Sequence, residues 1–277
     1  MSKIAVTGAR GLVGRFVLAD LTAQGYEARA LTHVWWPECP VRDQREGDVR
    51  DFDWVKQNLE GCSAVIHLAG IPSPKAGNDS AVIQTNVGGT YHILLAAGEL
   101  GIKHVACASS DCTFGFTFSR HRPTPVYLPV DEEHPTHPDD SYGLSKLLGE
   151  RAADAVVQRF PEMYAASLRI SHVVGPEDYQ QGTEFASWQD NPDLGPWNLW
   201  SYIDGRDAAR AFRLAVESTR RGHDVFCIAS RRSRSSIPSQ HLAERYFPHA
   251  ELRGLTGHAS LEDSSRAERL LGFVAEY

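Results

Sequence analysis

The chain has 277 residues, of which 42% are apolar and 23% charged, as in ordinary globular proteins. Its formal net charge is −7 at pH 7 and no long basic run is present, which argues against nucleic acid or an anionic membrane as the main partner. No segment approaches the roughly 20 apolar residues that cross a bilayer, and the five cysteines have the spacing of neither a zinc site nor a disulfide framework, so we expect a cytoplasmic protein with reduced thiols and no metal site.

The first 170 residues alternate between short apolar runs and helical patterns. The predicted strands are 3–7, 27–32, 64–68, 105–109 and 164–170. The predicted helices are 11–23, 51–59, 79–100 and 141–160. Such alternation gives right-handed crossovers and a parallel sheet with helices on both faces. We therefore predict an α/β fold, a Rossmann-type doubly wound parallel sheet, over residues 1–170.

The pattern loosens after residue 170. Residues 171–200 are rich in Pro, Gly, Trp and acidic side chains. The later elements are a helix at 207–217, a strand at 224–228 and short helices at 240–247 and 264–271. We expect a segment from about 201 to 230 to return to the sheet, and residues 171–200 and 231–277 to form a small C-terminal substrate-binding lobe.

A glycine-rich turn joins the first strand to the first helix. Gly8 would permit the sharp turn, Gly11 would let the backbone approach a pyrophosphate, and Gly14 would let the helix pack close to the strand. The anion would then lie at a helix N-terminus, where free N–H groups favour it. The spacing in its strand–turn–helix context predicts a dinucleotide site. The other loop residues expected to contact it are Arg10, Leu12 and Val13.

The choice between NAD and NADP depends on the end of the second strand. NAD enzymes usually place an acid there to bind the ribose hydroxyls. This chain has Thr32 and His33 instead, with Arg10 in the glycine loop close by. A 2′-phosphate would be tolerated there. The sequence leaves both cofactors open and favours NADP slightly.

A second motif carries the expected chemistry. Tyr142 and Lys146 stand four residues apart on one predicted helix, so they share a face. A nearby ammonium would lower the tyrosine pKa from its usual value of about 10 towards neutrality and make the phenol a usable acid or base. Ser110, at the end of a strand, would hydrogen bond the substrate oxygen as charge develops on it. Together they predict hydride transfer at a carbon–oxygen centre.

These residues resemble the extended short-chain dehydrogenase/reductase family, which includes sugar-nucleotide epimerases and dehydratases. The similar motifs are Thr7-Gly8-x-x-Gly11-x-x-Gly14, Gly47-Asp48-Val49-Arg50-Asp51, His67-Leu68-Ala69-Gly70, Asn86-x-x-Gly89-Thr90, Ser109-Ser110, Tyr142-x-x-x-Lys146 and Trp200-Ser201-Tyr202-Ile203-Asp204.

The resemblance implies further roles in cofactor binding and assembly. Asp48 and Val49 would border the adenine, Leu68 and Ala69 would line the cofactor with their backbone, and Asn86 would brace the helix behind the active site. Asn86 and Ile170 would complete the cofactor-binding residues. A homodimer through the helices at about 79–100 and 141–160 is also implied.

The departures from the family pattern bear on the substrate. Ser110 is followed by Asp111 and Cys112 rather than by the Asp-Glu pair of the dehydratases, which disfavours water elimination. His172 and Trp200 stand where nucleotide-sugar epimerases carry an asparagine and a diphosphate-binding arginine. We expect these four residues, Asp111, Cys112, His172 and Trp200, to line the substrate site. Arg253 is a loose match to a second phosphate contact.

The length and the helix motif are closer to uronate dehydrogenases, yet Glu177–Gly205 has no Lys or Arg to bind a carboxylate. The same stretch carries Trp188, Trp197 and Trp200, whose faces suit a sugar ring. A neutral or amino-bearing small substrate is therefore expected, unless Arg120 or Arg122 supplies the missing charge.

Three functions remain open at this point. The first is an NAD(P)-dependent dehydrogenase or reductase acting on a small sugar-like alcohol or ketone. The second is an NAD(P)-dependent sugar or nucleotide-sugar epimerase, which retains its cofactor. The third is a non-catalytic dinucleotide-binding regulator, which the Tyr142–Lys146 pair disfavours.

Overall fold

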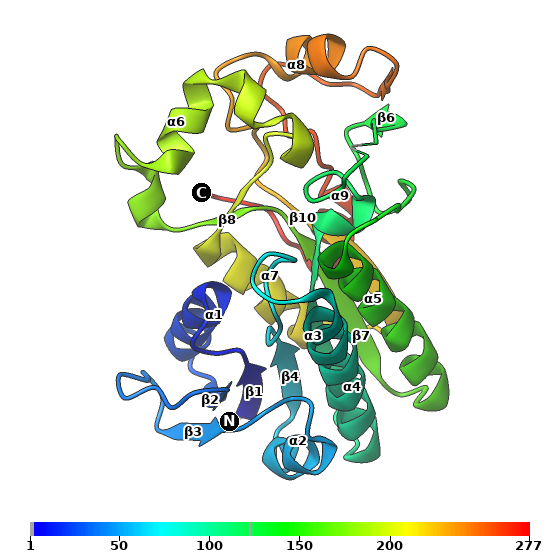
Figure 1. The fold of residues 1–277 in the computed structure, drawn as a ribbon. Coiled ribbons are helices and arrows are strands. Elements are labelled where there is room, and N and C mark those ends of the chain that lie inside the picture. The colour runs from blue at the N-terminus through cyan, green and yellow to red at the C-terminus, as the bar shows by residue number, and fades with distance from the viewer. Residues whose placement is uncertain (1–2, 122) are drawn as a thin grey trace.

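A computed structural model describes residues 3–121 and 123–277. Its centre is a seven-stranded sheet in the order β10-β7-β5-β4-β1-β2-β3, and every neighbouring pair is parallel (Figure 1). The strands are β1 (Lys3–Thr7), β2 (Glu27–Thr32), β3 (Asp43–Glu46), β4 (Ala64–His67), β5 (His104–Ser110), β7 (Tyr164–Ile170) and β10 (Gly222–Ile228). The predicted Rossmann-type α/β fold is confirmed.

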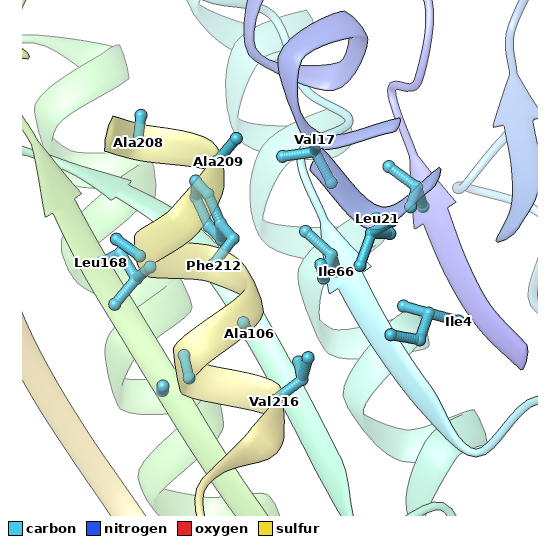
Figure 2. Packing of buried hydrophobic residues seen from close by; sticks show 14 of the residues in the cluster. Ile4, Val17, Leu21, Ile66, Ala106, Leu168, Ala208, Ala209, Phe212 and Val216 are labelled. Carbon is cyan, nitrogen blue, oxygen red and sulfur yellow. The ribbon is translucent and has the colours of Figure 1, made fainter. Parts of the chain in front are cut away.

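Helices cover both faces of the sheet (Figure 1). The long helices are α1 (Leu12–Ala23), α2 (Phe52–Leu59), α4 (Gly89–Glu99), α5 (Ser141–Arg159) and α7 (Gly205–Glu217). Helices α1 and α7 pack against each other on one face, where Val17, Phe212 and Val216 meet Ile66 and Leu168 of the strands (Figure 2). Helices α2, α4 and α5 cover the other face. Because both faces are covered, the central strands are buried almost along their whole length rather than alternating between buried and exposed residues.

Two elements differ from the sequence prediction. The helix expected at 79–100 is broken into α3 (Asp79–Ile83), a π-helical turn η1 (Gln84–Gly88) and α4. Single π-turns of this kind are common at functional sites. The short edge strand β3 was not predicted, because its sequence, Asp-Gln-Arg-Glu, carries no apolar pattern.

Apart from α7 and β10, the segments after β7 build a small lobe beyond the carboxyl ends of the strands (Figure 1). Its core also takes in Phe114, Phe116, Leu128 and Val130, from before residue 170. Two strand pairs, β8 with β9 and β6 with β11, join its loops. Its elements, with the loop elements around them, are η2 (Asp111–Phe114), β6 (Tyr127–Leu128), β8 (Val173–Val174), η3 (Pro176–Tyr179), α6 (Glu184–Asp190), η4 (Pro192–Leu194), η5 (Pro196–Asn198), β9 (Ile203–Asp204), α8 (Ser239–Tyr246), β11 (Glu251–Leu252) and α9 (Ser265–Leu271).

Strand β10 pairs with β7 in the main sheet, so the chain returns to the sheet after the first part of the lobe. The domain boundaries themselves stay a prediction. The five cysteines are free, as their spacing predicts. Within the described ranges, no helix is both long and apolar enough to cross a membrane.

Candidate active site

A cavity of about 1020 Å³ opens at the carboxyl ends of the sheet strands, where ligands of doubly wound folds bind. Most of the residues predicted from the sequence line it. They are Gly8, Arg10, Gly11, Leu12, Val13, Gly14, Thr32, His33, Asp48, Val49, Leu68, Ala69, Ser110, Asp111, Cys112, Tyr142, Lys146, Ile170 and His172.

The glycine loop has the shape that a pyrophosphate cradle needs. Gly8 has φ +63°, and a Cβ there would lie 2.7 Å from the backbone nitrogen of Ala69. A Cβ on Gly14 would lie 2.5 Å from the Gly8 oxygen, so this glycine lets α1 begin directly beside β1. Gly11 is the N-cap of α1 and supplies no capping side chain. The first N–H groups of the helix thus remain available to an anion, and the loop fits a dinucleotide.

Thr7 fixes the neighbouring wall of the cavity. Its hydroxyl oxygen accepts hydrogen bonds from the backbone nitrogens of Leu68 and Ala69, each at 3.1 Å. The same oxygen lies 2.7 Å from Nδ1 of His67. Burial lowers the pKa of His67 to about 3, so the ring is neutral and accepts the Thr7 proton. The threonine is thereby fully paired, and it locks the two β4-end residues against the glycine loop.

The ribose end of the cavity combines buried and exposed groups. The Thr32 hydroxyl is directed to the Arg45 carbonyl of β3 at 3.4 Å, whereas Arg10 and His33 are exposed. Asp48 accepts hydrogen bonds from the backbone nitrogen and the guanidinium of Arg50. The Arg50 hydrogen bond holds the pKa of Asp48 below its usual range, so this carboxylate stays charged at the adenine end.

Ser110, Tyr142 and Lys146 meet at the other end of the cavity. The Asp140 carboxylate caps α5 by accepting from the backbone nitrogens of Tyr142 and Gly143, each at 2.9 Å, which fixes the first turn of the helix. Lys146 Nζ donates to the Ala108 carbonyl at 2.8 Å and lies 5.6 Å from the Tyr142 ring centroid. The Ser110 hydroxyl donates to Asp111 Oδ1 at 2.9 Å and accepts from the backbone nitrogen of Cys112 at 3.2 Å.

The protein around these groups shifts both of the main pKa values. Burial raises the pKa of Tyr142 above its usual value, with the Ser110 hydrogen bond opposing. Burial lowers the pKa of Lys146 to about 8. In the protein alone the Tyr142 pKa is therefore raised rather than lowered as predicted, because desolvation of the phenolate dominates. A positive charge added to the cavity would favour the phenolate and lower this pKa.

The model of the NAD dependent epimerase/dehydratase family matches residues 4–229 of the chain. The chain belongs to this family. It is 32% identical to an L-arabinose 1-dehydrogenase (NAD(P)(+)) of Haloferax volcanii over 79% of its own length and 84% of that protein's. It is 29% identical to a uronate dehydrogenase of Pseudomonas putida over 78% and 88% of the two chains.

Solved structures share the fold of this family member. One is a short-chain dehydrogenase/reductase superfamily protein from Agrobacterium tumefaciens with bound NAD, with TM-score 0.74 and 24% identity over 99% of this chain and 93% of that one. Another is UDP-glucose 4-epimerase from Brucella ovis in complex with NAD, with TM-score 0.75 and 22% identity over 100% and 94%. The protein is thus an NAD(P)-dependent dehydrogenase/reductase or epimerase, and the hypothesis of a non-catalytic regulator is rejected.

Two residues that the sequence predicted to contact ligands do not line the cavity. Asn86, in the π-helical turn, is buried behind the cavity wall, where its amide pairs with the backbone of Ile71 and donates to Ser145 Oγ at 3.0 Å. It therefore braces α5, as the resemblance implies, without lining the cavity. Trp200 was predicted to line the substrate site and does not. It is completely buried in the core of the lobe, and its Nε1 donates to the Pro192 carbonyl at 2.9 Å.

Arg120 and Arg253, two of the arginines proposed as a source of positive charge, do not line the cavity either. Arg253 pairs with Glu251 and lies 3.5 Å above the ring of Tyr127. Arg120 is exposed, and its backbone nitrogen donates to Asp139. Arg122 lies outside the described residues.

Sequence reasoning missed two residues near the site. Glu262 is a buried carboxylate that accepts from Ser171 Oγ at 3.0 Å, and its pKa is raised well above the usual range, first by burial and then by the charge of Asp111. Arg234 lies over the ring of Trp188, with Cζ 4.0 Å from the centroid. Both follow the predicted catalytic helix by many residues and lie in loops without periodicity, so no local pattern indicated them. The lobe thus brings a carboxyl group next to Ser171 and a guanidinium next to Trp188, close to the cavity.

Proposed function

We propose that this enzyme is an NAD(P)-dependent dehydrogenase of a small sugar-like alcohol, using Ser110, Tyr142 and Lys146. The observation that carries the proposal is their convergence: the three side chains line one end of a cavity whose other end is the glycine loop. A dinucleotide bound with its pyrophosphate at that loop extends along the same cavity towards the three side chains. The sugar dehydrogenases among the relatives support the substrate class.

The protein groups have separate tasks in this reaction. Ser110 hydrogen bonds the reacting oxygen and is itself held by Asp111, whose Oδ1 accepts from Ser110 Oγ at 2.9 Å. Tyr142 takes the hydroxyl proton during oxidation and returns it during reduction. An oxidised dinucleotide would supply the hydride acceptor, together with a positive charge that favours the phenolate otherwise disfavoured by burial. The Lys146 ammonium, charged below a pH of about 8, adds to that charge and can donate to ribose hydroxyls.

Both NAD and NADP are proposed as cofactors, with NADP binding at least as well as NAD. No carboxylate follows β2, where Thr32 and His33 stand, and the exposed Arg10 lies in the adjoining loop. A 2′-phosphate would therefore meet a guanidinium rather than an acid.

Epimerisation is the second candidate, and relatives include a UDP-glucose 4-epimerase. We favour the dehydrogenase because Trp200, at the position of the diphosphate-binding arginine of epimerases, is locked in the lobe core.

We also propose a homodimer through α4 and α5. These helices pack against each other, and Tyr91, Leu144 and Leu148 on them are exposed. Exposed apolar side chains on adjacent helices suit a helical interface.

A panel of substrates tests the proposed activity. Free sugars, sugar acids, sugar phosphates, polyols and nucleotide sugars are each incubated with NAD and with NADP, and the absorbance of reduced nicotinamide is followed. We expect turnover with free sugars or their acids. Turnover restricted to nucleotide sugars, or dinucleotide that stays bound through purification and returns its hydride, would instead establish the epimerase.

A further inference from the structure

A second cavity, of about 490 Å³, lies between α6 and the loop that follows β10. Its charged lining is basic: Arg232 and Arg234 contribute to it with His258, and no carboxylate lines it among the residues that the structure describes. Arg234 connects it to the catalytic cavity. Its Nη2 donates to Asn198 Oδ1 at 2.9 Å, and Asn198 lines the catalytic cavity.

Among the described residues, the Nε and Nη1 groups of the Arg234 guanidinium have no hydrogen-bond partner. The residue is 4% exposed, and both Nε and Nη1 are buried without a hydrogen-bond acceptor. These two nitrogens carry three of the five N–H donors of an arginine. Buried polar groups in folded proteins are nearly always paired, and an unpaired buried charge is strongly unfavourable. An arginine kept in this state has donors to offer to a ligand.

The surroundings keep Arg234 close to the reaction site. Its guanidinium lies on one side of the Trp188 ring, and the His172 ring packs edge-on against the same tryptophan, with centroids 5.1 Å apart. His172 lines the catalytic cavity. Desolvation and, next, the charge of Arg234 lower the pKa of His172, so the imidazole stays neutral and Arg234 is the permanent cation here. Glu184 is the carboxylate that acts on Arg234, but burial outweighs it and lowers the arginine pKa to about 10.

The loop around Arg234 is built to present donors. Ser233 and Ser235 each accept a backbone N–H two residues ahead, at 3.1 and 3.2 Å, which fixes the turn. A hydroxyl that accepts still has its own proton to donate. Both serines line the second cavity beside Arg234.

We propose that Arg234 binds an oxyanion, a carboxylate or a phosphate carried by the substrate, in the second cavity while the reacting alcohol lies at Ser110 and Tyr142. This inference rests on the proposed function and names its substrate class. It replaces the expectation of a neutral substrate, since that expectation depended on the absence of Lys and Arg from Glu177–Gly205, and the structure brings an arginine there from another segment. Trp188 lies against the guanidinium, with its ring centroid 4.0 Å from Arg234 Cζ, so we expect an incoming oxyanion to displace this ring of α6.

Binding, measured without turnover, tests the inference. Glucuronate, glucose 6-phosphate and glucose are titrated by calorimetry into the wild-type protein, Arg234→Gln and Arg231→Gln. The last variant is the control, because Arg231 lies in the same loop but is exposed and does not line the cavity. We expect at least one of the two anions to bind the wild type and the control about 10- to 100-fold more tightly than glucose, as charge-assisted hydrogen bonds allow. Arg234→Gln should lose that advantage while keeping its affinity for glucose, and Arg234→Lys should retain part of it.

Three results would overturn the inference. These are equal affinity of the wild type for glucose and both anions, an anion advantage that survives in Arg234→Gln, and binding of inorganic phosphate at Arg234 that does not compete with either anion. The outcome is separable from that of the proposed function. Anion binding without turnover in the substrate panel would reject the dehydrogenase alone, and turnover of neutral sugars without an anion advantage would reject the role of Arg234 alone.

Discussion

Replacing Glu150 with glutamine tests how the fold holds the candidate site together. Glu150 of α5 accepts from Ser109 Oγ at 2.6 Å and from Arg169 Nε and Nη2 at 2.9 and 2.8 Å. Its side chain is 3% exposed and that of Arg169 is 5% exposed. The three residues tie α5 to the ends of β5 and β7, next to Ser110 and Ile170, so this buried cluster positions the catalytic helix against the sheet.

The expected loss follows from these contacts. Glutamine keeps one acceptor oxygen and replaces the other with an amide NH₂ group, which would face Arg169 as a donor. The guanidinium is then left buried without a counter-charge. Removing one partner of a buried ion pair costs about 3–5 kcal/mol. We expect the free energy of unfolding to fall by about that amount, and the melting temperature by roughly 6–20 °C at about 2–4 °C per kcal/mol.

Urea unfolding followed by far-ultraviolet circular dichroism measures the effect, with the midpoint expected to fall at an unchanged m value. Arg151→Gln is the matched control. Its side chain is 71% exposed in a pair with Asp154, so a change below about 0.5 kcal/mol is expected. The double variant Glu150→Met/Arg169→Met should recover much of the loss, since apolar replacement of a whole buried pair is often neutral. A loss below about 1 kcal/mol in Glu150→Gln would refute the reasoning.

Three further predictions concern the cofactor and the assembly. Gly11→Asp should lower dinucleotide affinity at least about tenfold in calorimetry, because it places a carboxylate against the pyrophosphate. The dichroism spectrum should not change, because a Cβ there meets only the Gly8 oxygen, at 3.1 Å. Unchanged affinity would exclude the loop from dinucleotide binding. NADP should bind at least as tightly as NAD, and Arg10→Ala should weaken NADP selectively by about tenfold, as expected for a charge-assisted contact; a strong NAD preference in wild-type competition experiments would reject the phosphate contact. Leu148→Glu, at a side chain 38% exposed, should shift a dimer towards monomer in sedimentation velocity, whereas a wild-type protein that sediments as a monomer would exclude the proposed interface.

The parts of the site that were predictable are those fixed by local backbone geometry. Gly8 and Gly14 are required because a Cβ at either would collide with the backbone, so a short stretch of sequence determines the turn. Tyr142 and Lys146 share a face because their helical spacing places them there. Ser110 ends a buried strand, and the carboxyl ends of parallel strands meet at one edge. Each of these inferences needs only a short segment.

The parts that were missed depend on segments far apart in the chain. Trp200 looked like a ligand contact, but Leu199 and Trp200 adopt φ values of 55° and 49° that turn the indole into the lobe core. Arg234 reaches the substrate end from a loop after β10, and Glu262 reaches Asp111 from near the C-terminus. Such loops follow no hydrophobic period, so their packing is decided by the assembled lobe rather than by local sequence.

The central claim is that Tyr142 exchanges the proton that accompanies hydride transfer. With a sugar that the substrate panel identifies and with saturating dinucleotide, the turnover of Tyr142→Phe is compared with that of the wild type, and the dinucleotide affinity of both is measured by calorimetry. We predict a fall in turnover of about 10²–10⁴-fold, the usual contribution of general acid–base catalysis. Because the change removes one oxygen and little packing, we predict a dinucleotide affinity within about twofold of that of the wild type, a difference well below 1.4 kcal/mol of binding free energy. Turnover close to that of the wild type would contradict the account and remove Tyr142 from the mechanism.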